Sequence, residues 1–187
     1  MDINAIVEDF WASRARGVAY PPQWFDKLTL DQACRVQLGL LDKAVAAGAR
    51  QVGWKVGLTA AAIREQFRVH EPVFGYLLEE GRLDSGVEID LSTWQGTGFE
   101  NELCLRLGQP LRGPNVTTEQ ARAAVRGCHP SMELVENRGD FTAQLAVAVA
   151  DNVQQRAFVI GPEVALDAGM NLAAVRCAVD INGAEVA

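Results

Sequence analysis

Long hydrophobic segments are absent from this sequence. No apolar run approaches the roughly 20 residues that a membrane-spanning helix needs. The first residues, Met1-Asp2-Ile3-Asn4, lack the basic region and the apolar core of a signal peptide. We therefore expect a cytoplasmic protein that does not act at a membrane.

Positive charge is also scarce. The chain has 17 Lys and Arg residues against 24 Asp and Glu residues, which gives a formal net charge of -7. No basic stripe is available to neutralise phosphate groups, so we expect no nucleic-acid partner. A small anionic substrate is still compatible with this charge, because one lysine, one arginine or one metal ion can hold it.

Cysteine and histidine are few and follow no catalytic pattern. The four cysteines contain no C-x-x-C pair, as expected for small buried side chains in a reducing compartment. His70 and His129 lie beside expected loops, which favours structural roles. The sequence also lacks a P-loop, a G-x-G-x-x-G motif and a Ser-His-Asp arrangement.

The 187 residues suit one globular domain, with 49% hydrophobic and 22% charged residues. Periodicity and capping patterns predict helices at 3–13, 29–48, 59–67 and 117–127. Strands are predicted at 51–58, 74–78, 81–94, 100–107, 132–135, 157–160 and 172–181. Helices come early and strands late, so we expect an α+β fold with a helical part at 1–50 and a β-rich part at 51–187.

The last residues contain a strong hairpin signal. Asn182-Gly183 is typical of a two-residue turn after a strand, and only Ala184–Ala187 follow it. So short a return strand leaves an open sheet edge, which proteins usually avoid. We therefore expect a truncated chain that associates with itself as a homo-oligomer.

Three glutamates form the most informative pattern. Glu100 and Glu102 are two apart in an expected strand and point to one face, and Glu133 lies in another strand. Like charges so close repel unless a cation lies between them, and oxygen-ligated Mg²⁺ or Mn²⁺ is the simplest such cation. The alternative is a solvated strand face. Glu136 could equally be the inward carboxylate in place of Glu133. On a strand the two would point to opposite faces, so only one of them should join the site.

Lys55 is the second candidate. Alternation in Gly53-Trp54-Lys55-Val56-Gly57 places Gly53, Lys55 and Gly57 on one face. Glycine in a strand often marks the close approach of a ligand, so Lys55 could move a proton or hold a carboxylate there. Alternatively, Lys55 extends its ammonium group to solvent at a strand end.

Asp151-Asn152 follows a stretch rich in alanine and valine. These side chains could position a substrate, although capping a turn is the default interpretation.

Six segments of the chain follow one another in an order that is typical of a known family. They are Gly53–Thr59, Glu71–Gly75, Phe99–Leu103, Met132–Arg138, Val149–Asn152 and Phe158–Gly161. In this order they resemble the fumarylacetoacetate hydrolase superfamily. The matching branch contains the 2-hydroxypenta-2,4-dienoate (2-keto-4-pentenoate) hydratases and the 4-oxalocrotonate decarboxylases. The resemblance implies N-terminal helices packed on a mixed, mostly antiparallel β-structure.

The resemblance also implies roles for single residues. Glu100, Glu102 and Glu133 would bind Mg²⁺ or Mn²⁺, and Lys55 would be the acid–base residue. The substrate would be a small 2-oxo or 2-hydroxy dienoic acid, in contact with Gly53, Gly57, Asp151 and Asn152. The activity would be a hydro-lyase that adds water to 2-hydroxypenta-2,4-dienoate in the meta-cleavage breakdown of aromatic compounds.

Two departures from the family pattern keep alternatives open. Val73 stands where many hydratases have an acidic residue, which leaves a 2-oxo-3-hexenedioate (4-oxalocrotonate) decarboxylase as an alternative. The family chain continues well beyond Ala187, so a non-catalytic relative that binds metal, ligand or a partner subunit is a further alternative. An acylpyruvate hydrolase ranks third, because no His–Glu dyad is placed to activate water.

Overall fold

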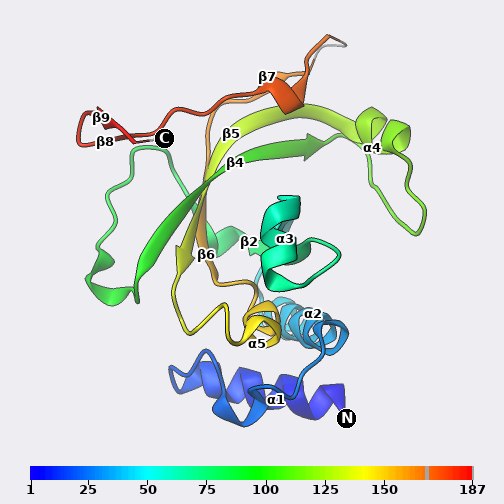
Figure 1. Cartoon of the computed structure of the whole chain (residues 1–187), viewed down its shortest axis with the longest axis vertical. Helices are drawn as coiled ribbons and strands as arrows, with labels where there is room; N and C mark the ends of the chain where they lie inside the picture. The colour runs from blue at the N-terminus through cyan, green and yellow to red at the C-terminus, as the bar shows by residue number, and fades with distance from the viewer. Residues whose placement is uncertain (167–168, 187) are drawn as a thin grey trace.

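The computed structural model describes residues 1–166 and 169–186, and it has the expected α+β architecture (Figure 1). The helices are α1 Ile3–Ala15, α2 Leu30–Ala46, α3 Ala61–Phe67, α4 Thr118–Ala124 and α5 Leu145–Ala150. The strands are β1 Gln51–Gly57, β2 Val73–Leu78, β3 Arg82–Leu83, β4 Thr97–Leu107, β5 Val125–Glu136, β6 Gln155–Ile160, β7 Val164–Ala165, β8 Asp180–Ile181 and β9 Ala184–Glu185.

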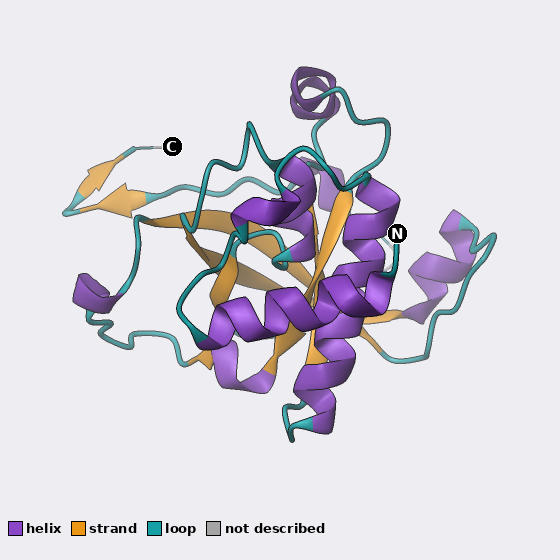
Figure 2. Ribbon diagram, turned by 90° about the horizontal axis from the view of Figure 1, so that it is seen from below, coloured by secondary structure: helices purple, strands orange, loops and turns teal. Residues whose placement is uncertain are grey.

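Helices α1, α2 and α5 form one layer below the sheets, and Figure 2 shows this layer from below. The start of α2 is fixed locally, because Thr29 and Gln32 form the predicted capping box. The apolar faces of the three helices meet in the main core, whose fully buried members include Ile6, Phe10, Val36, Leu40 and Val149. Val73 of β2 and Val153 after α5 belong to the same core, which therefore joins the helices to this strand and this segment.

The strands are mostly antiparallel, as predicted. β1 and β2 form an antiparallel pair, and a five-stranded sheet has the order β3-β6-β5-β4 with β7 paired to β5. The parallel pairing of β3 with β6 makes this sheet mixed. Long, curved β4 and β5 dominate Figure 1, and they carry the three glutamates of interest.

Several predicted boundaries are wrong. The helix expected at 117–127 ends at Ala124, and β5 begins at once and runs to Glu136, because it pairs with both β4 and β6. Of the strand expected at 81–94, only Arg82–Leu83 forms, since no neighbouring strand pairs with the rest. Ala60 rather than Thr59 is the N-cap of α3, without a side-chain bond.

The C-terminal hairpin is confirmed in a reduced form. Strands β8 and β9 pair across Asn182-Gly183, whose φ angles of 53° and 81° are those of a turn that favours asparagine and glycine. The preceding strand predicted from Leu172 is limited to Asp180–Ile181. Ala187 lies outside the described residues.

Among the residues described, no helix is both long enough and apolar enough to cross a bilayer.

The contact between α1 and α2 depends on Gly39. A Cβ atom at this position would lie only 2.6 Å from Cγ2 of the buried Val7. We expect Gly39→Ala to lower the free energy of unfolding by about 1–3 kcal/mol, the usual cost of overpacking. Urea denaturation measures the change.

A Val7→Ala variant serves as a second background, in which the effect of Gly39→Ala on packing can be distinguished from its effect on helix propensity. In a Val7→Ala chain the added methyl group has room, so Gly39→Ala should stabilise the protein there by up to about 1 kcal/mol. An equal effect of Gly39→Ala in both backgrounds would contradict the packing explanation.

Candidate metal centre

Three carboxylates meet on one face of the β4–β5 pair. Glu100 lies directly opposite Glu133 in the antiparallel register, and Glu102 lies two residues further along β4. One carboxylate oxygen from each of the three side chains lies within 4.8 Å of the others. Glu133 is buried, whereas Glu100 and Glu102 reach the surface. This is an all-oxygen ligand set of the kind that Mg²⁺ and similar cations prefer.

Glu136, the alternative third carboxylate, lies elsewhere. It accepts a hydrogen bond of 2.9 Å from the Gln95 backbone and forms an ion pair of 3.6 Å with Arg138. Because side chains alternate along a strand, Glu133 and Glu136 point to opposite faces of β5. The structure therefore groups Glu133, and not Glu136, with Glu100 and Glu102.

Electrostatics disfavours three ionised groups at this place. Burial raises the pKa of Glu133, Lys55 opposes that rise, and the charges of Glu100 and Glu102 add to it. Burial also raises the pKa of Glu102, together with the charge of Glu100, while Lys55 again opposes the rise. A divalent cation would remove this repulsion, so the residues fit such an ion.

Lys55, in β1, lies beside the three carboxylates of β4 and β5. Its side chain is only 9% exposed, and its Nζ lies 2.7 Å from Oε1 of Glu133. Nζ also donates a hydrogen bond of 3.2 Å to the backbone carbonyl of Val153. Lys55 thus points inward and does not extend to solvent.

The glycine that makes room for Lys55 is Gly75, which the sequence analysis missed. It lies opposite Lys55 in the β1–β2 register, and a Cβ atom there would lie 3.1 Å from both Cγ and Cε of Lys55. By contrast, added Cβ atoms at Gly53 and Gly57 would meet Leu77 and Val73. The only available signal was the glycine within the V-F-G-Y segment, and its importance depends on the pairing of two strands.

Two hollows adjoin the lysine and the carboxylates. One, of about 350 Å³, has Lys55, Glu102 and Glu133 in its wall, and most of its other lining is apolar. The second, of about 250 Å³, is lined by Lys55, Gly57 and Glu100 and by the apolar side chains of Leu58, Phe67, Val135, Phe141 and Val153. Phe67 and Phe141 meet edge to face, with their ring centres 5.5 Å apart. Charged groups beside apolar walls suit a small acid with a hydrocarbon chain.

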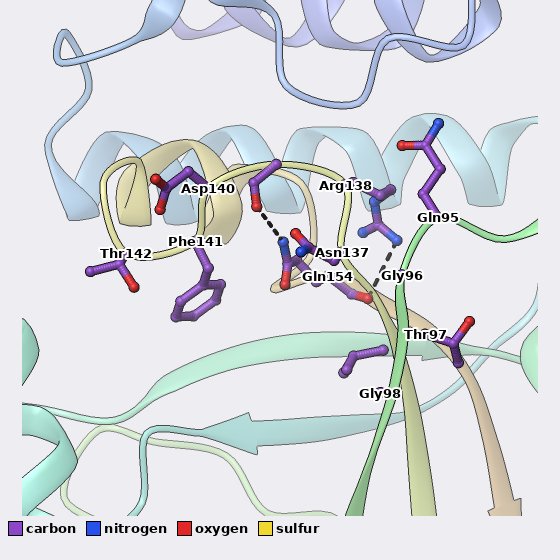
Figure 3. Close-up of a pocket in the computed structure, with 12 residues that line it drawn as sticks. Gln95, Gly96, Thr97, Gly98, Asn137, Arg138, Asp140, Phe141, Thr142 and Gln154 are labelled. Carbon is purple, nitrogen blue, oxygen red and sulfur yellow. Dashed lines mark hydrogen bonds between the residues drawn. The ribbon is translucent and has the colours of Figure 1, made fainter.

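A larger hollow of about 890 Å³ adjoins the second one, with which it shares Val135, Phe141 and Gln154. Figure 3 shows Arg138, Phe141 and Gln154 in its wall, near Gly96 and Gly98. None of the three clustered glutamates lines it. It is therefore not the candidate metal centre.

Asp151 and Asn152 are buried, with 2% and 5% exposure. Asp151 forms ion pairs with Arg14 at 3.0 Å and Arg138 at 2.6 Å. The Asn152 amide bonds to the backbone of Tyr76. Direct contact of Asp151 or Asn152 with a substrate stays a prediction.

The known proteins to which the chain is similar are hydratases and decarboxylases. No family model matches the chain. The chain is 37% identical over 163 residues to a 4-oxalocrotonate decarboxylase of Pseudomonas sp, covering 86% of this chain and 63% of that protein. It is 30% identical over 186 residues to a 2-hydroxypent-2,4-dienoate hydratase of Pseudomonas putida, covering 97% and 83%. A 2-hydroxyhexa-2,4-dienoate hydratase of Comamonas testosteroni is 31% identical, and the chain covers 61% of its length.

Solved structures show the same fold. A 4-oxalocrotonate decarboxylase from Pseudomonas putida G7, complexed with magnesium and adipate, matches with a TM-score of 0.77 and 24% identity. The match covers 87% of this chain and 64% of that chain. A second structure of this enzyme, complexed with calcium and acetate, also has a TM-score of 0.77, with 25% identity. The chain thus spans less than two thirds of several relatives that it matches.

The Lys55–Glu133 pair should be important for stability. Removing one partner of a buried ion pair leaves the other charge unpaired, so Lys55→Met should lower the free energy of unfolding by about 3 kcal/mol. Lys43→Met is the matched control, because Lys43 pairs with the exposed Glu8. It should cost about 1 kcal/mol or less. Equal losses in urea denaturation would show that the buried pair has no special role.

Proposed function

Because the chain belongs to the 2-hydroxypentadienoate hydratase and 4-oxalocrotonate decarboxylase branch of the fumarylacetoacetate hydrolase superfamily, we propose that it is a divalent-metal-dependent lyase. Its reaction adds water to 2-hydroxypenta-2,4-dienoate and gives 4-hydroxy-2-oxopentanoate, in the meta-cleavage breakdown of aromatic compounds. The observation that carries this proposal is the grouping of three carboxylates beside the inward-pointing Lys55.

In this proposal Glu100, Glu102 and Glu133 hold Mg²⁺ or Mn²⁺. The oxygen ligands and their mutual repulsion support this assignment. A cation held there would supply positive charge that stabilises negative charge on the C2 oxygen of the substrate.

Lys55 is the proposed acid–base residue. Its ammonium group donates a proton to C5 of the dienoic acid and recovers one from the 2-hydroxyl group, which gives the conjugated 2-oxo-3-enoic acid. Water then adds across the C3–C4 double bond, with its oxygen at C4 and a proton at C3. The ion pair of 2.7 Å with Glu133 holds the Lys55 ammonium group beside the carboxylates. Apolar side chains such as Phe67 and Phe141 face the neighbouring hollow, where they suit the hydrocarbon end of the substrate and restrict water.

A decarboxylase is the second candidate. The relative with 37% identity is named a 4-oxalocrotonate decarboxylase, and this favours 2-oxo-3-hexenedioate as an alternative substrate. Loss of CO₂ would develop negative charge on the same C2 oxygen, so the same residues would serve. A non-catalytic relative that binds metal, ligand or a partner subunit is the remaining alternative.

We also propose a homo-oligomer, supported by the exposed apolar stripe of Val52, Trp54 and Val56 on β1.

An ultraviolet assay distinguishes these functions. We expect the purified chain to remove the absorbance of 2-hydroxypenta-2,4-dienoate only when Mg²⁺ or Mn²⁺ is present. CO₂ release from 2-oxo-3-hexenedioate, with an unchanged dienoate spectrum, would instead establish the decarboxylase. Turnover of neither acid by a folded, metal-binding sample would favour the non-catalytic relative.

The metal assignment is tested by Glu102→Gln. This variant should keep its fold, lose metal-dependent activity and bind Mg²⁺ more than about tenfold more weakly in calorimetry, since even outer-shell changes reach that size. The matched control is Glu88→Gln, because Glu88 is exposed and lies outside the cluster. Wild-type metal affinity and rate in Glu102→Gln would overturn the assignment.

A further inference from the structure

We propose that the buried segment 151–154 positions Lys55, and that Arg138 and Asn152 are positioning residues that hold this segment. The inference rests on the proposed function, in which Lys55 is the proton donor. The contact that links the two parts is the hydrogen bond of 3.2 Å from Lys55 Nζ to the Val153 carbonyl. It gives Arg138 and Asn152 a role in the reaction without direct substrate contact.

The backbone that presents this carbonyl is unusual. Asn152, Val153 and Gln154 all have positive φ angles, of 65°, 53° and 58°. Left-handed backbone is uncommon for residues other than glycine, and a β-branched residue such as valine is a genuine outlier there. Three such residues in succession need surrounding contacts that stabilise them.

Arg138 provides one set of these contacts. Its Nε lies 2.6 Å from Oδ2 of Asp151, and its guanidinium also donates to the backbone carbonyls of Asp151, Gln154 and Gln155. Figure 3 shows the bond from Arg138 to Gln154. The other carboxylate oxygen of Asp151 pairs with Arg14. One half-buried arginine therefore binds both the start and the end of the left-handed segment.

Asn152 provides the second set. Its Oδ1 accepts a hydrogen bond of 2.8 Å from the Tyr76 backbone N–H, and its Nδ2 donates one of 3.0 Å to the Tyr76 carbonyl. The amide thus occupies the place of a further strand beside β2. The adjacent Gly75 lies between this amide and Lys55, because its added Cβ would lie 3.0 Å from Asn152 Oδ1 and 3.1 Å from Lys55.

The arrangement determines where the Lys55 protons point. A lysine ammonium has three N–H donors. Within the described part of the chain, Nζ donates one hydrogen bond to the Val153 carbonyl and forms an ion pair of 2.7 Å with Glu133. A further N–H can donate to a substrate in the adjoining hollows. A carbonyl suits this purpose because it accepts a hydrogen bond without exchanging a proton at neutral pH.

The test observes Lys55 directly. The chain contains only three lysines, Lys27, Lys43 and Lys55, so ¹³C labelling at lysine Cε gives three signals, assigned with Lys55→Arg. At one fixed pH and without metal, the Lys55 signal should lie away from the position of a free lysine. In Asn152→Gly, which accepts positive φ but lacks the amide, this displacement should fall by at least half.

The matched control is Asn115→Gly. Asn115 is an exposed asparagine with a φ of 68°, so the same change occurs in the same backbone conformation far along the chain from Lys55. It should leave all three lysine signals unchanged. Arg138→Lys is a second variant, which keeps the charge opposite Asp151 but cannot reach all the carbonyls. An unchanged Lys55 signal in both folded variants would overturn the proposal, and so would an equal shift in Asn115→Gly.

Kinetics forms the second arm. In Arg138→Lys, kcat for the dienoate should fall at least tenfold while KM changes less than twofold, because the proton donor is misplaced and every predicted substrate contact is unchanged. A change confined to KM would overturn the positioning role. If the wild-type chain turns over no dienoate but the Lys55 signal moves as expected, the proposed function fails and the placement of Lys55 by segment 151–154 stands.

Discussion

The structure depends on one electrostatic constraint: three carboxylates share a face of the β4–β5 pair with a single ammonium group beside them. Burial and mutual repulsion raise the pKa of Glu102 and Glu133, so the fold must oppose a concentrated negative charge. Lys55 compensates part of this charge. A protein that keeps such an arrangement retains unfavourable electrostatics that a bound cation would relieve, and this links the stability of the sheet to the proposed chemistry.

The rest of the fold supports this constraint from two sides. The β4–β5 register places Glu100 opposite Glu133, and the β1–β2 register places Gly75 opposite Lys55. The helical layer below carries α5, whose end leads directly into the segment that contacts Lys55. The lysine is thus held by elements from three parts of the chain, and none of them alone would determine its position.

Local signals explain which features could be predicted. The capping box at Thr29 and the Asn182-Gly183 turn depend on neighbouring residues, and both formed as expected. The i, i+2 spacing of Glu100 and Glu102 was also enough to place them on one face. The start of β5 and the loss of the strand expected at 81–94 depend on pairing partners distant in sequence, so periodicity could not reveal them.

The same distinction applies to the candidate site. Gly53 and Gly57 flank Lys55 in the sequence, but the glycine whose missing side chain leaves space for Lys55 is Gly75 of the paired strand. Similarly, asparagine tolerates a left-handed backbone but valine disfavours it, so Asn152-Val153-Gln154 does not signal three such residues in succession. Residues distant in sequence, among them Arg138, Arg14 and Tyr76, stabilise that conformation. At this position the unfavourable backbone conformation, which contacts to the buried Asp151 stabilise, is therefore better evidence for function than the identity of any one residue. A turn without a functional role could adopt a more favourable conformation.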